Sequence, residues 1–123
     1  MAVTPIAMPE IISPKKLILL PINDETANPL TLQAGVAGQS IYIWGLFLFV
    51  NGATDLKLLS NATAIMGTMG FAAQGNLVLP KLYAGDPSHQ RAHPYAFTTA
   101  GDPLKISNSN GVRLSGGIYV SQQ

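Results

Sequence analysis

Residues 84–95 hold the one group of side chains in the sequence with the spacing of a metal site. His89 and His93 lie four residues apart, so a single helical turn would place both imidazoles on one face, with Asp86 as a third ligand. Prolines flank the two histidines and keep any such turn short. We therefore interpret this segment as a polar surface loop that contacts a partner, and a metal site is the alternative.

The common catalytic motifs are absent from the sequence. It contains no Walker lysine loop, no G-x-G-x-x-G turn, no H-E-x-x-H helix and no G-x-S-x-G elbow, and it has no cysteine. The 6 acidic residues are dispersed along the chain, so no pair of carboxylates is indicated for acid–base chemistry. We expect a protein that is not an enzyme and that uses no cofactor and no metal.

A group of aromatic residues is the second candidate for chemistry. Tyr42, Trp44, Phe47 and Phe49 follow one another within ten residues and could stack on sugars. Ile, Leu and Val surround them, which favours a role in the core or in an interface with a partner protein. The triplet Asn61-Ala62-Thr63 matches a glycosylation acceptor, and we give it no weight because it has meaning only in a secreted eukaryotic chain.

The element that carries these aromatic residues is a predicted strand over 40–51. Both of its faces are apolar, since Ile41 and Ile43 alternate with Tyr42 and Trp44, and a strand of this kind is buried on both sides. In a small two-layer domain, one side of each sheet meets the core and the other meets solvent. The second apolar face therefore needs a cover, from the N-terminal residues or from another subunit.

Short strands separated by glycine, asparagine and proline continue to the end of the chain, and no helix is predicted. Asn51-Gly52 indicates a hairpin into a returning strand that contains Leu56 and Leu58. This pattern predicts an all-β fold, a single antiparallel β-sandwich of jelly-roll type. The further strands are expected at 30–33, 65–71, 77–79, 95–98, 104–107 and 112–120.

Residues 1–25 are predicted to form an extended N-terminal arm in front of a sandwich domain over 26–123. Four prolines interrupt any helix in this segment and favour extended backbone. The arm is also apolar, so we expect it to lie against its own domain or against a neighbouring subunit. The residues expected to bind a partner are Ile6, Met8, Ile11 and Ile12 in the arm and Tyr42, Trp44, Phe47 and Phe49 in the strand.

Composition limits the kinds of partner. Charged residues make up 11% of the chain, about half the usual share, which favours a surface covered in part by other protein chains. The 7 basic residues are scattered and the net charge is +1, so nucleic-acid binding is not expected. No apolar run has the length of a membrane helix or the order of a signal peptide. We expect a soluble chain made in a reducing cytoplasm.

From residue 34 onward the order of features resembles the small β-sandwich proteins of tailed bacteriophages, in particular capsid decoration (cement) proteins and related head-fibre modules. The matching segments are AGQSIYI at 37–43, LFLFV at 46–50, IMG at 65–67, LVLP at 77–80, FTTAGDPLKI at 97–106 and SGGIYV at 115–120.

The resemblance implies a jelly roll, commonly trimeric, that binds the major capsid protein on the outer surface of a phage head and holds neighbouring subunits together. It would place the protein in the virion after synthesis in the host cytoplasm. The alternative is a trimeric head-fibre or tail module that contacts a host glycan through loop 84–95 and exposed aromatic residues. A third function, that of a connector or tail component, fits the same composition, and the sequence does not distinguish it from the other two.

Overall fold

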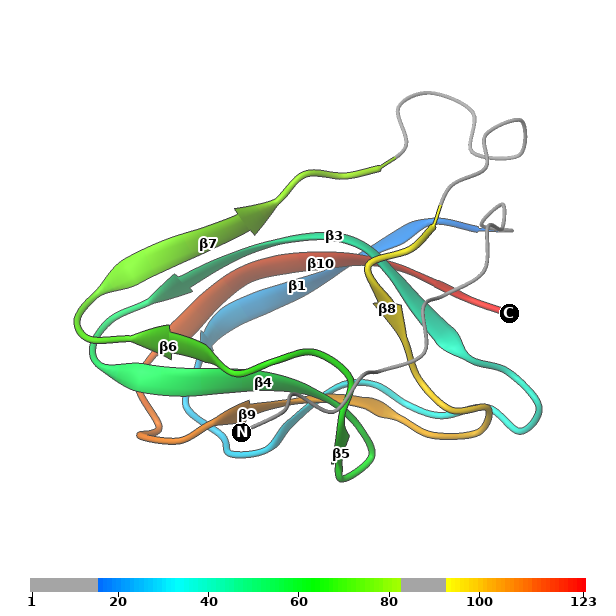
Figure 1. Ribbon diagram of the computed structural model, residues 1–123, viewed down its shortest axis with the longest axis horizontal. Helices are drawn as coiled ribbons and strands as arrows, with labels where there is room; N and C mark the ends of the chain where they lie inside the picture. The colour runs from blue at the N-terminus through cyan, green and yellow to red at the C-terminus, as the bar shows by residue number, and fades with distance from the viewer. Residues whose placement is uncertain (1–15, 83–92) are drawn as a thin grey trace, which may run out of the picture.

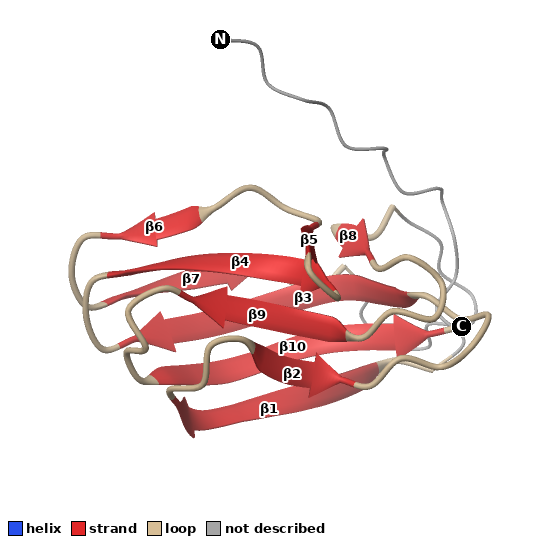
Figure 2. Cartoon of the chain, turned by 90° about the horizontal axis from the view of Figure 1, so that it is seen from below, coloured by secondary structure: helices blue, strands red, loops and turns tan. Residues whose placement is uncertain are grey.

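The computed structural model describes residues 16–82 and 93–123. Every regular element in these residues is a strand, and the strands form two antiparallel sheets that pack face to face (Figures 1 and 2), which confirms the predicted all-β sandwich. The sheet named here the β3 sheet has the order β1 (Ile18–Glu25), β10 (Leu114–Gln122), β3 (Ile41–Val50) and β7 (Gly75–Leu79), with β8 (Ala96–Phe97) paired to β3. The sheet named the β4 sheet has the order β2 (Leu30–Gln33), β9 (Leu104–Asn108), β4 (Thr54–Ser60) and β5 (Thr63–Ala64), with β6 (Met69–Phe71) paired to β4.

The strand pairs are nested as in a long hairpin that has been folded over on itself. β1 pairs with β10, β2 with β9, β3 with β7, and β4 with β5 and β6. The first four strands alternate between the two sheets, so successive pairs of the folded hairpin lie in opposite sheets. This is the topology of a jelly roll.

The core lies between the sheets and is built by alternate residues of each strand. Leu56 and Leu58 of β4 point inward and are fully buried, while Asp55 and Lys57 between them are exposed. Burial of each such side chain contributes about 1.5–3 kcal/mol to folding. The buried core consists of Ile22, Ile41, Ile43, Leu46, Leu48, Val50, Leu56, Leu58, Ala96, Leu104, Ile106, Leu114, Ile118 and Val120.

β3 changes its alternation at Trp44. Tyr119 lies opposite Gly45 and Val120 lies opposite Ile43, so Trp44 is an extra residue that forms a β-bulge. Because of the bulge, Ile43 before Trp44 and Leu46 after it both face the core.

A buried amide ties the turn between β9 and β10 to β4. The Thr54 hydroxyl donates to Asn108 Oδ1 at 2.6 Å, and Asn108 Nδ2 donates to the Val112 carbonyl at 2.7 Å. The backbone N–H of Asn51 donates to the carbonyl of Arg113 at 3.1 Å. These bonds fix the positions from which Asn51 and Arg113 extend at this end of the sandwich.

The hairpin predicted at Asn51-Gly52 is wrong. β3 and β4 belong to different sheets, and the segment between them crosses the end of the sandwich instead of pairing the two strands. The reason is the core: Leu56 and Leu58 must face β3 from the opposite sheet to be buried against it. The predicted strand at 65–71 is also corrected, because within it only Met69–Phe71 forms a strand.

The predicted boundary between arm and domain is corrected as well. Residues 18–25, assigned to the arm, form β1 and pair along β10. Pro21 is compatible with this position because β1 is the edge strand of its sheet, where a missing N–H breaks no ladder. The rest of the predicted arm, residues 1–15, lies outside the described residues.

Candidate interaction face

The outer faces of the two sheets differ in charge. The strands of the β4 sheet carry Asp55 and Lys57 on β4 and Lys105 on β9, with Thr31 of β2 exposed beside Lys105. In the five strands of the β3 sheet, the charged residues are Asp24 and Glu25 at the end of β1. The sandwich therefore has one polar outer face and one outer face that is mainly apolar.

The apolar face follows a row of residues that lie directly opposite one another on four strands. Pro21 of β1 pairs with Gly117 of β10, Gly117 pairs with Phe47 of β3, and Phe47 pairs with Val78 of β7. Val78 is 58% exposed and Pro21 is also exposed. We call these four residues the apolar row.

Side chains on either side of Gly117 close the gap in this row. A Cβ atom at Gly117 would come within 2.8 Å of Leu19 Cδ1 and 3.0 Å of Phe47 Cζ. The side chains of β1 and β3 thus lean over β10, and the ring of Phe47 lies 6.3 Å from that of Tyr119. Leu19 is still 46% exposed, so the contact forms a continuous apolar surface rather than a buried cluster.

Lys81 marks one border of the apolar row. Its ammonium lies 5.3 Å from the centroid of the Tyr119 ring, a cation–π contact worth about 0.5–1 kcal/mol at an exposed site. Polar groups at the border of an apolar patch are typical of protein interfaces.

The structure separates the aromatic residues that were predicted to bind a partner. Tyr42 is half-buried and stacks on Phe97 at 5.8 Å, while Phe47 lies in the apolar row. Phe49 is 54% exposed. Trp44 is corrected to a structural residue, because it is fully buried and its Nε1–H donates to Ser121 Oγ at 2.8 Å.

Two groups of predicted site residues are not placed. The partner-binding residues of the arm, Ile6, Met8, Ile11 and Ile12, lie outside the described residues, as does the loop that holds Asp86 and His89. Within residues 16–82 and 93–123, no three His, Cys, Asp or Glu side chains come together to hold a metal ion. No helix in the same part of the chain is long and apolar enough to cross a membrane.

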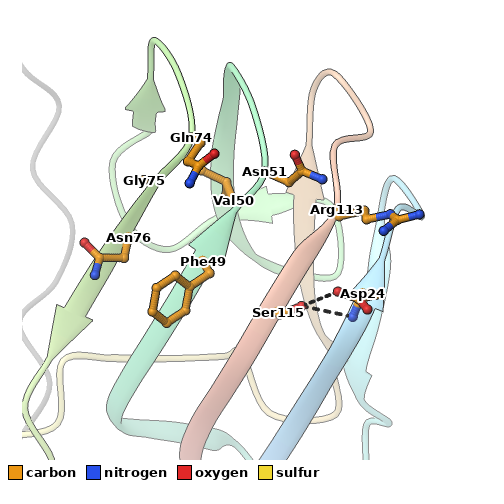
Figure 3. Close-up of a pocket in the computed structure, with 9 residues that line it drawn as sticks. All are labelled: Asp24, Phe49, Val50, Asn51, Gln74, Gly75, Asn76, Arg113 and Ser115. Atoms are coloured by element: carbon orange, nitrogen blue, oxygen red, sulfur yellow. Dashed lines mark hydrogen bonds between the residues drawn. The ribbon is translucent and has the colours of Figure 1, made fainter.

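An open depression lies at the Asp24 end of the β3 sheet (Figure 3). Its volume is about 530 Å³, and Phe49 stands between Ser115 on β10 and Asn76 on β7, its two cross-strand partners. The Asp24 backbone N–H donates to Ser115 Oγ at 3.1 Å, and the Ser115 hydroxyl donates to Asp24 Oδ1 at 2.8 Å. The lining residues are Asp24, Phe49, Val50, Asn51, Gln74, Gly75, Asn76, Arg113 and Ser115.

The sequence predicted Phe47 and Phe49 as partner-binding residues, but it did not predict the residues that lie beside them. Leu19 and Val78 come from strands far away in the sequence, and only the pairing of β1 with β10 and of β7 with β3 brings them together. The available signal was alternation, since Val78 lies between Leu77 and Leu79, which pack against the core.

Comparison with protein-family models, with curated proteins and with solved structures found no match.

Proposed function

We propose that this chain is a structural protein that decorates a phage head, and that it docks on the head through the apolar face. The observation that carries the proposal is the contrast between the two outer faces of the sandwich. One face is charged and suited to water, and the other exposes Leu19 and Val78 on either side of Phe47. Soluble monomers seldom expose a contiguous apolar surface of this kind without a partner.

The partner in this proposal is the major capsid protein, and the site of action is the outer surface of the virion. The resemblance from residue 34 onward supports this choice. The jelly-roll strand order supports it as well, because that topology recurs in viral capsid proteins, although it is also found in lectins and other families. The role is non-catalytic and requires no cofactor, nucleic acid or membrane.

The proposed mechanism is stoichiometric binding across boundaries between capsid subunits. A protein that binds only the assembled lattice stabilises that lattice by mass action. The apolar row supplies the surface for face-to-face contact. A strand from a capsid subunit would add at the β7 edge, which has no proline, whereas Pro21 has no N–H to offer a strand added beside β1.

The test is a titration of the purified protein onto phage heads assembled without it, with the bound copies counted at saturation. We expect occupancy of every equivalent lattice position and a head that resists heating better. Light scattering of the free protein, which we expect to report a trimer, gives the number of chains per bound unit. Binding at a single vertex would contradict decoration and favour the head-fibre or tail receptor-binding module, and absence of binding would contradict both.

A further inference from the structure

We propose that the depression around Phe49 is a binding site for a neutral saccharide. The proposal goes beyond docking on a head, because the depression lies at the end of the sheet and has the volume of a site for a small ligand. Its lining differs from the apolar row: Phe49 is flanked by Ser115 and Asn76, whereas Phe47 is flanked by Gly117 and Val78.

Phe49 supplies the apolar half of the site. The ring is 54% exposed even though it lies on a strand at the centre of the sheet. Aromatic rings contribute large contact areas at low entropic cost, and the C–H face of a pyranose is flat, apolar and similar in size to such a ring. Figure 3 shows the ring between Asn76 on one side and Ser115 on the other, and all three residues line the depression.

The rim supplies hydrogen-bonding groups of both kinds. Asn51, Gln74 and Asn76 carry side-chain amides, which donate and accept, and Asp24 accepts while Arg113 donates. A sugar hydroxyl also donates and accepts, so a mixed rim matches it better than a rim of one kind. Sites for small ligands typically combine an apolar wall with a few polar groups of this sort.

Charge selects the class of ligand. Asp24 and Arg113 are the two charged residues of the lining, and their formal charges cancel. A phosphate or sulfate ligand would meet the Asp24 carboxylate, and a cationic ligand would meet the Arg113 guanidinium. A neutral ligand with many hydroxyls avoids both conflicts.

Part of the rim is held in place before any ligand binds, at Asp24, Ser115 and the backbone of Asn51. The two hydrogen bonds between Asp24 and Ser115 join β1 to β10, and the backbone of Asp24 has a φ of 50°, which fixes where its carboxylate lies. Asn51 is tied to the carbonyl of Arg113 through its backbone. A site that is already ordered loses less conformational entropy on binding.

The test is a titration of isotope-labelled free protein with the methyl glycosides of glucose, galactose, mannose and N-acetylglucosamine, followed by NMR. We expect at least one of them to shift the amide signals of Asn51, Asn76 and Ser115 at millimolar concentrations. Phe49→Ala should weaken that binding by about tenfold or more, since stacking on an aromatic ring contributes on this scale. Asp24→Asn, which retains a residue type tolerant of positive φ, should weaken it by a smaller factor.

Val78→Ala is the matched control, because it shortens an exposed apolar side chain on the same face outside the depression. We expect it to leave the affinity for the glycoside unchanged. Absence of shifts with all four glycosides would overturn the proposal, as would shifts that Phe49→Ala leaves intact. Because the titration contains no phage heads, its result is independent of whether the protein decorates them.

Discussion

Val78→Asp is expected to weaken binding to phage heads by about 100-fold or more. Val78 is at one end of the apolar row and is 58% exposed, so docking through this row would bury the new carboxylate against apolar groups. A charge that is buried without a partner costs several kcal/mol. The same exposure leaves the free protein little changed, and we expect its free energy of unfolding to shift by no more than about 1 kcal/mol.

Thr31→Asp is the matched control for this variant. Thr31 is an exposed residue of β2 on the charged face, opposite Lys105, so both variants exchange a β-branched residue for aspartate on an outer face. We expect Thr31→Asp to bind heads like the unchanged protein. Equal binding by the two variants would contradict docking through the apolar row. A lower molecular mass of free Val78→Asp protein would instead assign the row to contacts between copies of the chain.

Gly116→Ala is expected to prevent folding. The backbone of Gly116 has a φ of 133°, and a Cβ atom there would lie 1.9 Å from the carbonyl oxygen of Phe47. β10 pairs with β1 on one side and with β3 on the other, so the clash would separate the strands at the centre of the sheet. We expect a loss of at least about 4 kcal/mol, which approaches the whole stability of many small domains.

Gly38→Ala separates the clash from the effect of backbone conformation. Gly38 also has a positive φ, of 77°, but a Cβ atom there meets nothing within 4 Å. We expect a cost of about 1–2 kcal/mol, that of a left-handed conformation in a residue other than glycine. Urea unfolding followed by circular dichroism measures both variants. A similar midpoint for the two would show that the sheet accommodates the Cβ atom at Gly116.

Local patterns in the sequence predicted the strands better than their pairing. Alternation correctly placed Leu114, Ile118 and Val120 on one inward face of β10. Asn51-Gly52 indicated a turn, and the chain does turn there, but a dipeptide does not specify whether the next strand returns in the same sheet or crosses to the other. That choice depends on which side chains meet in the core.

The bulge in β3 and the edge position of β1 also depend on the whole fold. Trp44 was predicted to bind a partner with the other aromatic residues of its strand, whereas it is the extra residue of the bulge, is buried and donates to Ser121. The prolines near the N-terminus predicted extended backbone, and β1 is extended. Its pairing with β10, 91 residues away at Asp24 and Ser115, has no signal in local sequence.

The sequence predicted some of the residues of the candidate face but not the others. Two apolar faces on one strand indicated that the outer face of β3 was unusual, and Phe47 and Phe49 were named for that reason. Leu19 and Val78 join them only through strand register, and the polar rim of the depression comes from four separate segments. Residues brought together in this way have no spacing that a single sequence can show.

The most direct test of docking through the apolar face is a labelling experiment with single cysteine residues. The chain contains no cysteine, so Val78→Cys and Thr31→Cys each introduce one thiol, on the apolar and the charged face respectively. The rate of reaction with a maleimide is measured for free protein and for protein bound to heads. Docking through the apolar face predicts strong protection of residue 78 on the head and unchanged labelling of residue 31. Unprotected labelling at 78, or protection at 31 alone, would contradict it.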